Sequence, residues 1–239
     1  MSGGNRLRLI QIPFSHNCVK VRRALELKGL DYETHDIAPM DRSAVSRSSG
    51  QALVPVLEDG GKGIADSTAI LRHLEQAYPE PSLLPEDPAL HAECWLLEDW
   101  ADRAFMALTR RIAYWNVLVT PGALEQLWFA DASALKRFIG VRVGKRAVTR
   151  RFRLSAGRNK RDEAEAKTAA ALALERLAGR PFLLGDRLTV ADVSLATMAA
   201  PLIAGRAELR SDPAIKELIA WAGTVAGEQT LALYGSLTG

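Results

Sequence analysis

The residues best suited to chemistry lie where an apolar run ends and an amphipathic helix begins. Residues 7–12 predict a strand, Pro13 interrupts it, and Ser15 follows as a favourable N-cap. A helix N-terminus carries unpaired N–H groups and partial positive charge, which stabilise an anion. Cys18 follows Ser15 by three residues, so a hydroxyl and a thiol can share one face of the first turn. We therefore expect the chemistry at this turn.

The composition predicts a globular protein without a metal site or a membrane span. Of the 239 residues 48% are apolar and 25% are charged, and the formal net charge is +3. Cys18 and Cys94 form no disulfide framework, and with the four histidines they show no metal-ligand spacing. No run reaches the roughly 18 apolar residues of a membrane helix. The N-terminus lacks the apolar core of a secretion signal, so we expect a cytoplasmic protein.

The first third of the chain alternates strand and helix patterns. After the helix at Ser15, residues 32–37 predict a second strand, and 38–51 a polar loop with room for one helical turn. Residues 54–65 predict a hairpin around a Gly-rich turn, and Asp66-Ser67 then begins a helix. Four prolines within residues 79–88 predict a stiff linker.

The remainder of the chain predicts helices only. Residues 90–115 have the period of one long helix, and Pro121 opens a second one, which continues through Leu135 and Phe138. An Ala- and Leu-rich helix follows at 163–177. Thr189 and Asp192 form a capping box before an almost entirely apolar helix at 193–202, which we expect at the centre of a bundle. We therefore predict an α/β domain at residues 1–79, a Pro-rich linker at 80–88 and an all-helical domain at 89–239.

Three local patterns, in this order, resemble the cytosolic glutathione transferase superfamily. They are the turn and helix FSHNCVKVR at 14–22, the segment LVPVL at 53–57, and Asp66-Ser67 at the start of a helix, with the capping box further on. The resemblance covers almost the whole chain. It implies a thioredoxin-like α/β N-terminal domain that binds glutathione as co-substrate, an all-α C-terminal bundle that completes the substrate pocket, and a homodimer.

The resemblance also implies a glutathione site. A cis Val54-Pro55 bond would present the Val54 backbone to glutathione, so that the tripeptide pairs like an added strand. Asp66 and Ser67 would hold the amine and the carboxylate of its γ-glutamyl end. Plain helix capping is the competing interpretation of this pair. Phe14, beside the turn, completes the expected glutathione-binding set.

Ser15 is the expected catalytic residue. Its hydroxyl and the helix N-terminus would stabilise the glutathione thiolate over the thiol, whose ordinary pKa is about 8.5. That thiolate would attack a small apolar electrophile. A role as helix cap alone is the competing interpretation of Ser15. Cys18 is a secondary candidate, because a thiol–disulfide oxidoreductase could use it. The attacking thiol of such enzymes belongs at the position of Ser15, so we favour a buried structural role for Cys18.

Residues beside Ser15 and on the long helix are candidates for the acceptor pocket. His16 either lines that pocket or faces solvent, and we favour solvent. The helical candidates are Arg103, Arg110, Arg111, Tyr114 and Trp115. Two other functions stay open on this fold: a glutathione-dependent isomerase or lyase, and a non-catalytic binding protein.

A basic segment, residues 136–161, contains eleven Lys and Arg residues and no acidic residue. Only Phe138 and Phe152 interleave with these cations, and no recognition motif accompanies them, so nucleic acid is a poor fit as partner. We expect a solvated helix face with a polar loop, and we rank an anionic acceptor or partner second.

Overall fold

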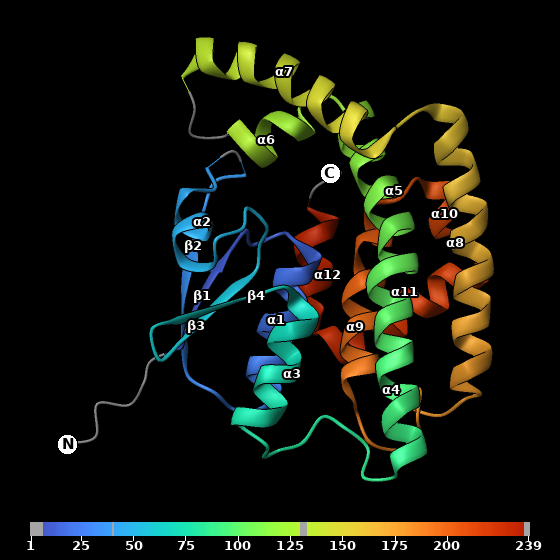
Figure 1. Ribbon diagram of the computed structural model, residues 1–239. Helices are drawn as coiled ribbons and strands as arrows, with labels where there is room; N and C mark the ends of the chain where they lie inside the picture. The colour runs from blue at the N-terminus through green and yellow to red at the C-terminus, as the bar shows by residue number, and fades with distance from the viewer. Residues whose placement is uncertain (1–6, 40, 130–132, 237–239) are drawn as a thin grey trace.

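A small mixed sheet forms the first part of the molecule. The computed structural model describes residues 7–39, 41–129 and 133–236 (Figure 1). The elements of this part are β1 (Leu7–Gln11), α1 (His16–Leu27), β2 (Tyr32–Asp36), α2 (Ser43–Ser49), β3 (Val56–Asp59), β4 (Lys62–Ala65) and α3 (Ser67–Ala77). The strand order is β2-β1-β3-β4, with β1 parallel to β2 and antiparallel to β3. The predicted α/β N-terminal fold is confirmed.

Helices make up the rest of the described chain. They are α4 (Pro88–Trp100), α5 (Met106–Val119), α6 (Ala123–Phe129), α7 (Ala134–Phe152), α8 (Ala156–Leu177), α9 (Val190–Ala199), α10 (Ala207–Arg210), α11 (Pro213–Ala226) and α12 (Glu228–Gly235). A π-helical segment, Ala101–Phe105, joins α4 to α5, and a 3₁₀ segment, Ala200–Ala204, follows α9. No described helix combines the length and the apolar character needed to cross a membrane.

Local sequence signals explain where several helices begin. Asp87 caps α4 by accepting from the N–H groups of the next turn, and Pro88 takes the first helical position. Asp212 and Pro213 begin α11 in the same way. The predicted capping box before α9 is confirmed, because the Asp192 carboxylate accepts from the Thr189 N–H at 2.8 Å.

Several helices differ in extent from the sequence-based expectation, including α8, which begins at Ala156, and α9, which spans Val190–Ala199. The expected helix from Pro121 through Phe138 is instead two helices, α6 and α7, and the side chain of Leu135 lies outside the described residues. The long helix is present but contains the π-helical segment. The basic segment is almost entirely helical, in α7 and the start of α8, because the expected polar loop is reduced to residues 153–155.

The centre of the bundle is α9, as predicted, since all ten of its residues are buried. One cluster of buried apolar side chains continues from α9 to the sheet through α1 and α3, and includes Leu25, Leu71 and Leu195. Figure 1 shows α1 and α3 between the sheet and the bundle. A buried ion pair also crosses this contact: Lys20 Nζ of α1 lies 2.8 Å from Glu98 Oε1 of α4. The sheet and the bundle are therefore held as one body around α1.

Candidate functional site

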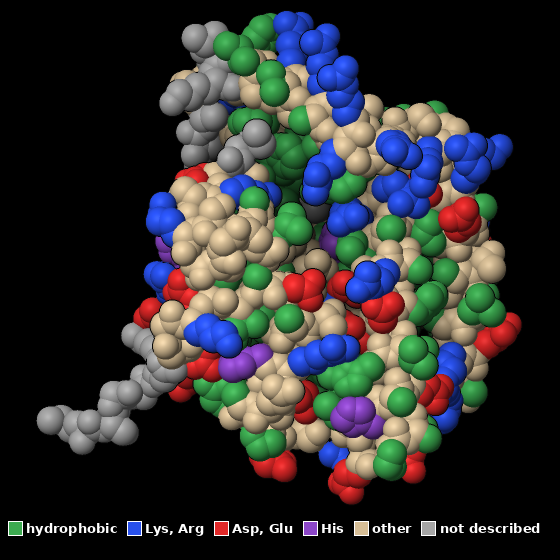
Figure 2. All heavy atoms as spheres, in the orientation of Figure 1, with side chains coloured by type: hydrophobic (Ala, Val, Ile, Leu, Met, Phe, Trp, Pro, Cys, Tyr) green, Lys and Arg blue, Asp and Glu red, His purple; other side chains and the backbone are tan. Residues whose placement is uncertain are grey.

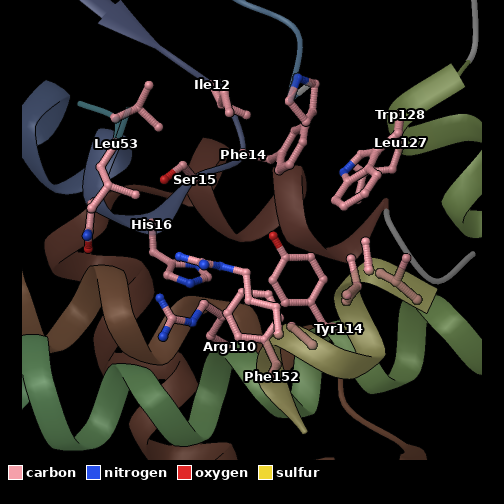
Figure 3. Close-up of a pocket in the computed structure, with 18 of the residues that line it drawn as sticks. Ile12, Phe14, Ser15, His16, Leu53, Arg110, Tyr114, Leu127, Trp128 and Phe152 are labelled. Carbon is pink, nitrogen blue, oxygen red and sulfur yellow. The ribbon is translucent and has the colours of Figure 1, made fainter. Parts of the chain in front are cut away.

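A cleft of about 390 Å³ lies between the turn that precedes α1 and the helices α5, α6 and α7 (Figure 3). Ser15 and its neighbours form one side of the cleft. Tyr114 of α5 lies across from them, and Trp128 of α6 and Phe152 of α7 complete the wall. The cleft thus brings the expected catalytic turn together with side chains from more than 90 positions further along the chain.

Ser15 occupies the N-cap position of α1 but does not use its side chain to cap the helix. Its backbone is fixed, because its N–H donates to the Ile12 carbonyl and its carbonyl accepts from the Val19 N–H, both at 2.9 Å. Within the described residues its hydroxyl makes no capping hydrogen bond, and it lies at the cleft. The hydroxyl therefore does not serve as a helix cap, and it lies at a helix N-terminus, where an anionic ligand is stabilised.

Cys18 is fully buried one turn into α1, beneath Ser15. Burial raises the pKa of its thiol to about 11, although contacts with the Ile12 backbone and the Ser15 side chain act in the opposite direction. A thiol that attacks a disulfide must be accessible and partly ionised at neutral pH. Cys18 is neither, so the structure agrees with the buried role and disfavours the oxidoreductase.

His16 lines the cleft rather than facing solvent, and the sequence-based preference for solvent was wrong. The reason is that side chains from far along the chain lie beside it: the Tyr234 ring of α12 is 6.2 Å from the His16 ring, and Arg110 of α5 lines the same cleft. Burial, and next the positive charge of Arg110, lower the pKa of the His16 imidazole to about 3. Its Nδ1 atom is buried and has no hydrogen-bond partner among the described residues. His16 is therefore a neutral ring at neutral pH.

The helical candidates for the acceptor pocket divide between two faces. Arg110 and Tyr114 line the cleft. Arg111 points to α8 instead, where its guanidinium holds the Asp162 carboxylate at 2.6 and 2.8 Å. Trp115 lines a separate hollow beside α8. The expectation was wrong for both, because α8 packs against that face of α5.

Arg103 also lies outside the cleft. Its side chain is 78% exposed and pairs with Asp99. In an unbroken α-helix, residues seven apart share a face, so Arg103 would align with Arg110. Arg103 lies inside the π-helical segment, Ala101–Phe105, whose wider turn rotates the side chains that follow it by about 100° for each extra residue. Arg110 reaches the cleft and Arg103 does not.

The expected glutathione-site residues lie in two places. Phe14 and Val54 line the cleft, and the Val54-Pro55 peptide bond is cis. Pro55 is buried behind them. Asp66 and Ser67 lie at the N-terminus of α3, outside the cleft lining.

At the start of α3 the two residues differ in their surroundings. Asp66 is exposed, and one of its carboxylate oxygens accepts from the Ala69 N–H at 3.0 Å. Ser67 is 1% exposed, and its hydroxyl lies 3.4 Å from the Asp102 carboxylate of the π-helical segment. The structure thus contains the cap that we considered as the competing interpretation, with the Asp66 charge still open to solvent.

Several cleft residues were not among the sequence-based candidates. They are Arg42, Leu53, Trp128, Arg151, Phe152 and Tyr234. Arg151 and Phe152 belong to the basic segment, whose charge was the only available signal. Tyr234 has no local signal, because it reaches the cleft from the far end of the chain. Among the described residues, no group of His, Cys, Asp and Glu side chains is arranged to hold a metal ion.

Comparison with known proteins agrees with this geometry. Residues 9–82 match the family "Glutathione S-transferase, N-terminal domain", and residues 156–222 match "Glutathione S-transferase, C-terminal domain". Glutathione S-transferase Z1 of Arabidopsis thaliana is 40% identical over 90 residues, which are 36% of this chain and 41% of the plant protein. The matched segment therefore spans less than half of that relative.

Two further similarities extend over most of the chain. Maleylacetoacetate isomerase of Rattus norvegicus is 28% identical over 211 residues, covering 83% of this chain and 79% of the rat protein. The crystal structure of the theta class glutathione S-transferase of Xanthomonas axonopodis pv. citri, with glutathione bound, has a TM-score of 0.68 at 21% identity, covering 95% of each chain. The fold and the two family matches define a thioredoxin-like domain joined to a helical bundle. The chain belongs to the glutathione transferase superfamily.

Proposed function

We propose that the chain is a glutathione transferase in which Ser15 stabilises the glutathione thiolate. The observation that carries this proposal is the position of the Ser15 hydroxyl. It lies at the N-terminus of α1, is not engaged in capping within the described residues, and lines the same cleft as Val54. A hydrogen bond to the thiolate and the partial charge of the helix end both favour the ionised sulfur, and so lower its pKa.

Glutathione would lie along the edge between Val54 and the start of α3. The Val54 backbone can pair with the extended tripeptide, and the Asp66 carboxylate can pair with its γ-glutamyl amine. At the other end of the tripeptide, the Arg42 guanidinium suits the glycyl carboxylate. Arg42 lines the cleft beside Leu53 and Val54, and its Nη1 atom is buried without a partner among the described residues.

The residues around Ser15 favour a single reactive sulfur, that of the ligand. The Cys18 thiol is protonated at neutral pH, and the His16 ring is neutral. Ser15 would hold the thiolate while the opposite wall holds the electrophile, so that both reactants meet in one orientation. A carbon–sulfur bond then forms, the leaving group departs with its bonding electrons, and the thiol proton passes to solvent.

A glutathione-dependent isomerase is the second candidate. The similarity to rat maleylacetoacetate isomerase over 83% of the chain favours it. Such a reaction would use the same thiolate and the same Ser15, so residue substitutions do not separate the two functions. Product analysis does: a transferase releases a sulfur-containing adduct, whereas an isomerase releases a product with the composition of its substrate.

Calorimetric titration with reduced glutathione tests the proposal. We expect saturable binding at one site per chain. The Ser15→Ala variant should bind glutathione with nearly unchanged Kd while kcat falls by roughly 10²-fold or more, since the hydroxyl acts on the thiolate and the transition state. No binding at millimolar glutathione would overturn the transferase. Loss of turnover in Cys18→Ala with normal turnover in Ser15→Ala would assign the reaction to Cys18.

Ser155→Ala is a matched control for Ser15→Ala. Ser155 is also a helix N-cap, at the start of α8, and its hydroxyl accepts from the Arg158 N–H at 3.2 Å. It lies outside the cleft lining. Its loss should cost about 1 kcal/mol of stability and leave kcat unchanged, which separates helix capping from thiolate activation.

We also propose that the protein is a homodimer, as the family resemblance implies. Sedimentation equilibrium tests this: a dimer has twice the 26.0 kDa mass of the chain. The cytoplasmic location stays a prediction from the sequence.

A further inference from the structure

The charged side chains that line the described part of the cleft are all positive. Three guanidinium groups line it, from Arg42 beside α2, Arg110 of α5 and Arg151 of α7. None of the described residues that line the cleft is Asp or Glu. Burial lowers the pKa of Arg110, and the neighbouring charge of Arg151 acts in the same direction. A cleft of this kind favours a negatively charged occupant.

Unused hydrogen-bond donors point to the same conclusion. The Nε atom of Arg110 is buried and has no partner among the described residues, as is Nη1 of Arg42. A buried charged donor without an acceptor is costly, and most such groups in proteins are paired. An anionic ligand in the cleft would supply the acceptors.

The two guanidinium groups of the helical part are held against one aromatic ring. The Arg110 guanidinium lies 4.9 Å from the centre of the Phe152 ring, and that of Arg151 lies 5.8 Å from it. Tyr114 stacks on Phe152, with ring centres 4.9 Å apart and planes 17° apart. Trp128 meets Tyr114 edge to face at 6.3 Å. One wall of the cleft therefore combines flat aromatic surfaces with two guanidinium groups that lie beside them.

Glutathione accounts for only part of this positive charge. In the proposed function, Asp66 and the α3 terminus hold one end of the tripeptide and Arg42 holds the glycyl carboxylate. Arg110 and Arg151 come from α5 and α7, across the cleft from the Val54 edge. They are left for the second substrate. The segment that carries Arg110 and Arg151, residues 83–155, also lies between the two regions that match the family.

We propose that Arg110 and Arg151 bind a carboxylate of the electrophile, and that the electrophile is a planar aromatic or conjugated molecule rather than a neutral apolar one. This inference rests on the proposed glutathione transferase function. The flat part of the substrate lies against Tyr114, Phe152 and Trp128, and its carboxylate accepts from the two guanidinium groups. The electrophilic carbon then faces the sulfur at Ser15.

A matched pair of electrophiles tests the inference. We would use 4-chloro-3,5-dinitrobenzoate and its methyl ester, which differ in the negative charge. In both, the thiolate forms a bond to the ring carbon that carries chlorine, chloride leaves, and the thiol proton is released to solvent. The native protein should have a higher kcat/KM for the acid than for the ester, after subtraction of the uncatalysed rates.

The variants then locate the preference. The double substitution Arg110→Gln and Arg151→Gln should lower kcat/KM for the acid by roughly 10- to 100-fold, the value of a charge-assisted hydrogen bond or two. Turnover of the ester should change by less than about threefold, since the ester lacks the charge that these bonds need. Arg142→Gln is the control, because Arg142 is an exposed arginine of the same α7, as Arg151 is, but it rests over Phe138 and lies outside the cleft lining. An equal loss for acid and ester, or no loss for the acid, would overturn the inference.

A binding measurement keeps the inference testable if no turnover is found. Calorimetry with 3,5-dinitrobenzoate and methyl 3,5-dinitrobenzoate needs neither glutathione nor reaction. Binding of the acid that exceeds binding of the ester tenfold or more, and that is lost in the double variant, would support the anion site even if the transferase reaction failed. Equal binding of both compounds would refute the anion site even if glutathione conjugation of neutral electrophiles were established.

Discussion

The hydroxyl of Tyr234 donates a hydrogen bond of 3.2 Å to the carbonyl oxygen of Phe14, the residue before Ser15. Tyr234 belongs to the last helix, α12, and is 2% exposed. Its ring also lies 6.2 Å from the ring of His16. The end of the chain thus holds the turn on which the proposed chemistry depends.

Tyr234→Phe should loosen this turn without removing its packing. We expect a loss of about 1 kcal/mol in the free energy of unfolding, because one buried hydrogen bond is lost and the ring remains. The kcat for conjugation should fall with it, whereas Tyr234→Ala should cost roughly 3–5 kcal/mol through the cavity it leaves. Urea unfolding and steady-state kinetics check both variants. Equal stability of Tyr234→Phe and the native protein would show that the hydrogen bond contributes nothing.

Lys20→Met should destabilise the contact between α1 and the bundle. Lys20 Nζ is fully buried between Glu98 at 2.8 Å and Asp102 at 2.6 Å. Its removal leaves the buried Glu98 carboxylate without its cation. We therefore expect the free energy of unfolding to fall by roughly 3–5 kcal/mol. Adding Glu98→Gln should restore part of that loss, since the fully buried carboxylate is then neutral and only the half-buried Asp102 keeps its charge. Urea unfolding of the single and double variants measures the coupling.

Arg8→Met serves as the comparison for Lys20→Met. Arg8 pairs with Glu58 at 2.6 Å, a similar distance, but the Arg8 side chain is 46% exposed. Solvent screens this pair, so its loss should cost less than about 1 kcal/mol. If both substitutions had the same cost, burial would not be the reason for the effect of Lys20.

Asp66→Asn should separate helix capping from glutathione binding. Asparagine caps a helix about as well as aspartate, so the hydrogen bond from the Ala69 N–H and the stability should be retained. The missing charge should weaken glutathione binding by roughly tenfold, because the amine then has a neutral partner. Asp66→Ala should lose about 1 kcal/mol of stability in addition. Calorimetry and thermal unfolding distinguish these outcomes, and unchanged affinity in Asp66→Asn would remove Asp66 from the binding site.

The neutral His16 ring should make stability depend on pH. Its pKa is about 3 in the folded chain and 6.5 ordinarily, so below pH 6.5 the unfolded chain binds a proton that the folded chain does not. The contribution of His16 to the free energy of unfolding is fully present above pH 6.5. It decreases as the pH falls towards 3, by up to about 1.4 kcal/mol per pH unit. His16→Gln should flatten the stability profile between pH 7 and pH 5. Parallel profiles for the native protein and His16→Gln would contradict this.

Gly140→Ala should displace the outer wall of the cleft. A methyl group at Gly140 of α7 would overlap the Phe129 ring of α6, and one at Gly144 would lie 3.5 Å from Trp128. For Gly140→Ala we expect the free energy of unfolding to fall by about 1–3 kcal/mol. The KM for the electrophile should rise, and the Kd for glutathione should stay unchanged. Gly157→Ala on α8 meets open space, so it should be neutral or stabilise by up to about 1 kcal/mol. Equal effects of the two substitutions would mean that α6 moves freely to accommodate α7.

The features predictable from the sequence were those with a local cause. The turn at Ser15, the hairpin and the capping box at Thr189 each depend on residues within a few positions of one another. The central position of α9 followed from its composition, since a helix that is apolar on all sides must be buried.

The predictions failed where contacts between distant segments, or an irregular helical turn, determine which side chains line the cleft. His16 was expected in solvent because Arg110, which lines the same cleft and whose charge acts on the His16 ring, is 94 positions away in the sequence. Arg103 was a candidate for the acceptor pocket as part of one long helix, and the π-helical segment that contains Arg103 interrupts this helix. Tyr234 was not predicted as a cleft residue, because nothing near it in the sequence indicates that it contacts the turn before Ser15.

The ion pair between Arg111 and Asp162 has a consequence for how such a protein changes over time. This ion pair holds α5 against α8. The end of α5 at Val119 and the start of α8 at Ala156 therefore lie near each other, although 36 residues separate them in the sequence (Figure 1). Between them lie α6 and α7, and Lys and Arg side chains gather over α7 in Figure 2. We therefore expect evolution to vary the length and the side chains of α6 and α7, and with them the substrate preference, while the α5–α8 contact and the turn at Ser15 are retained.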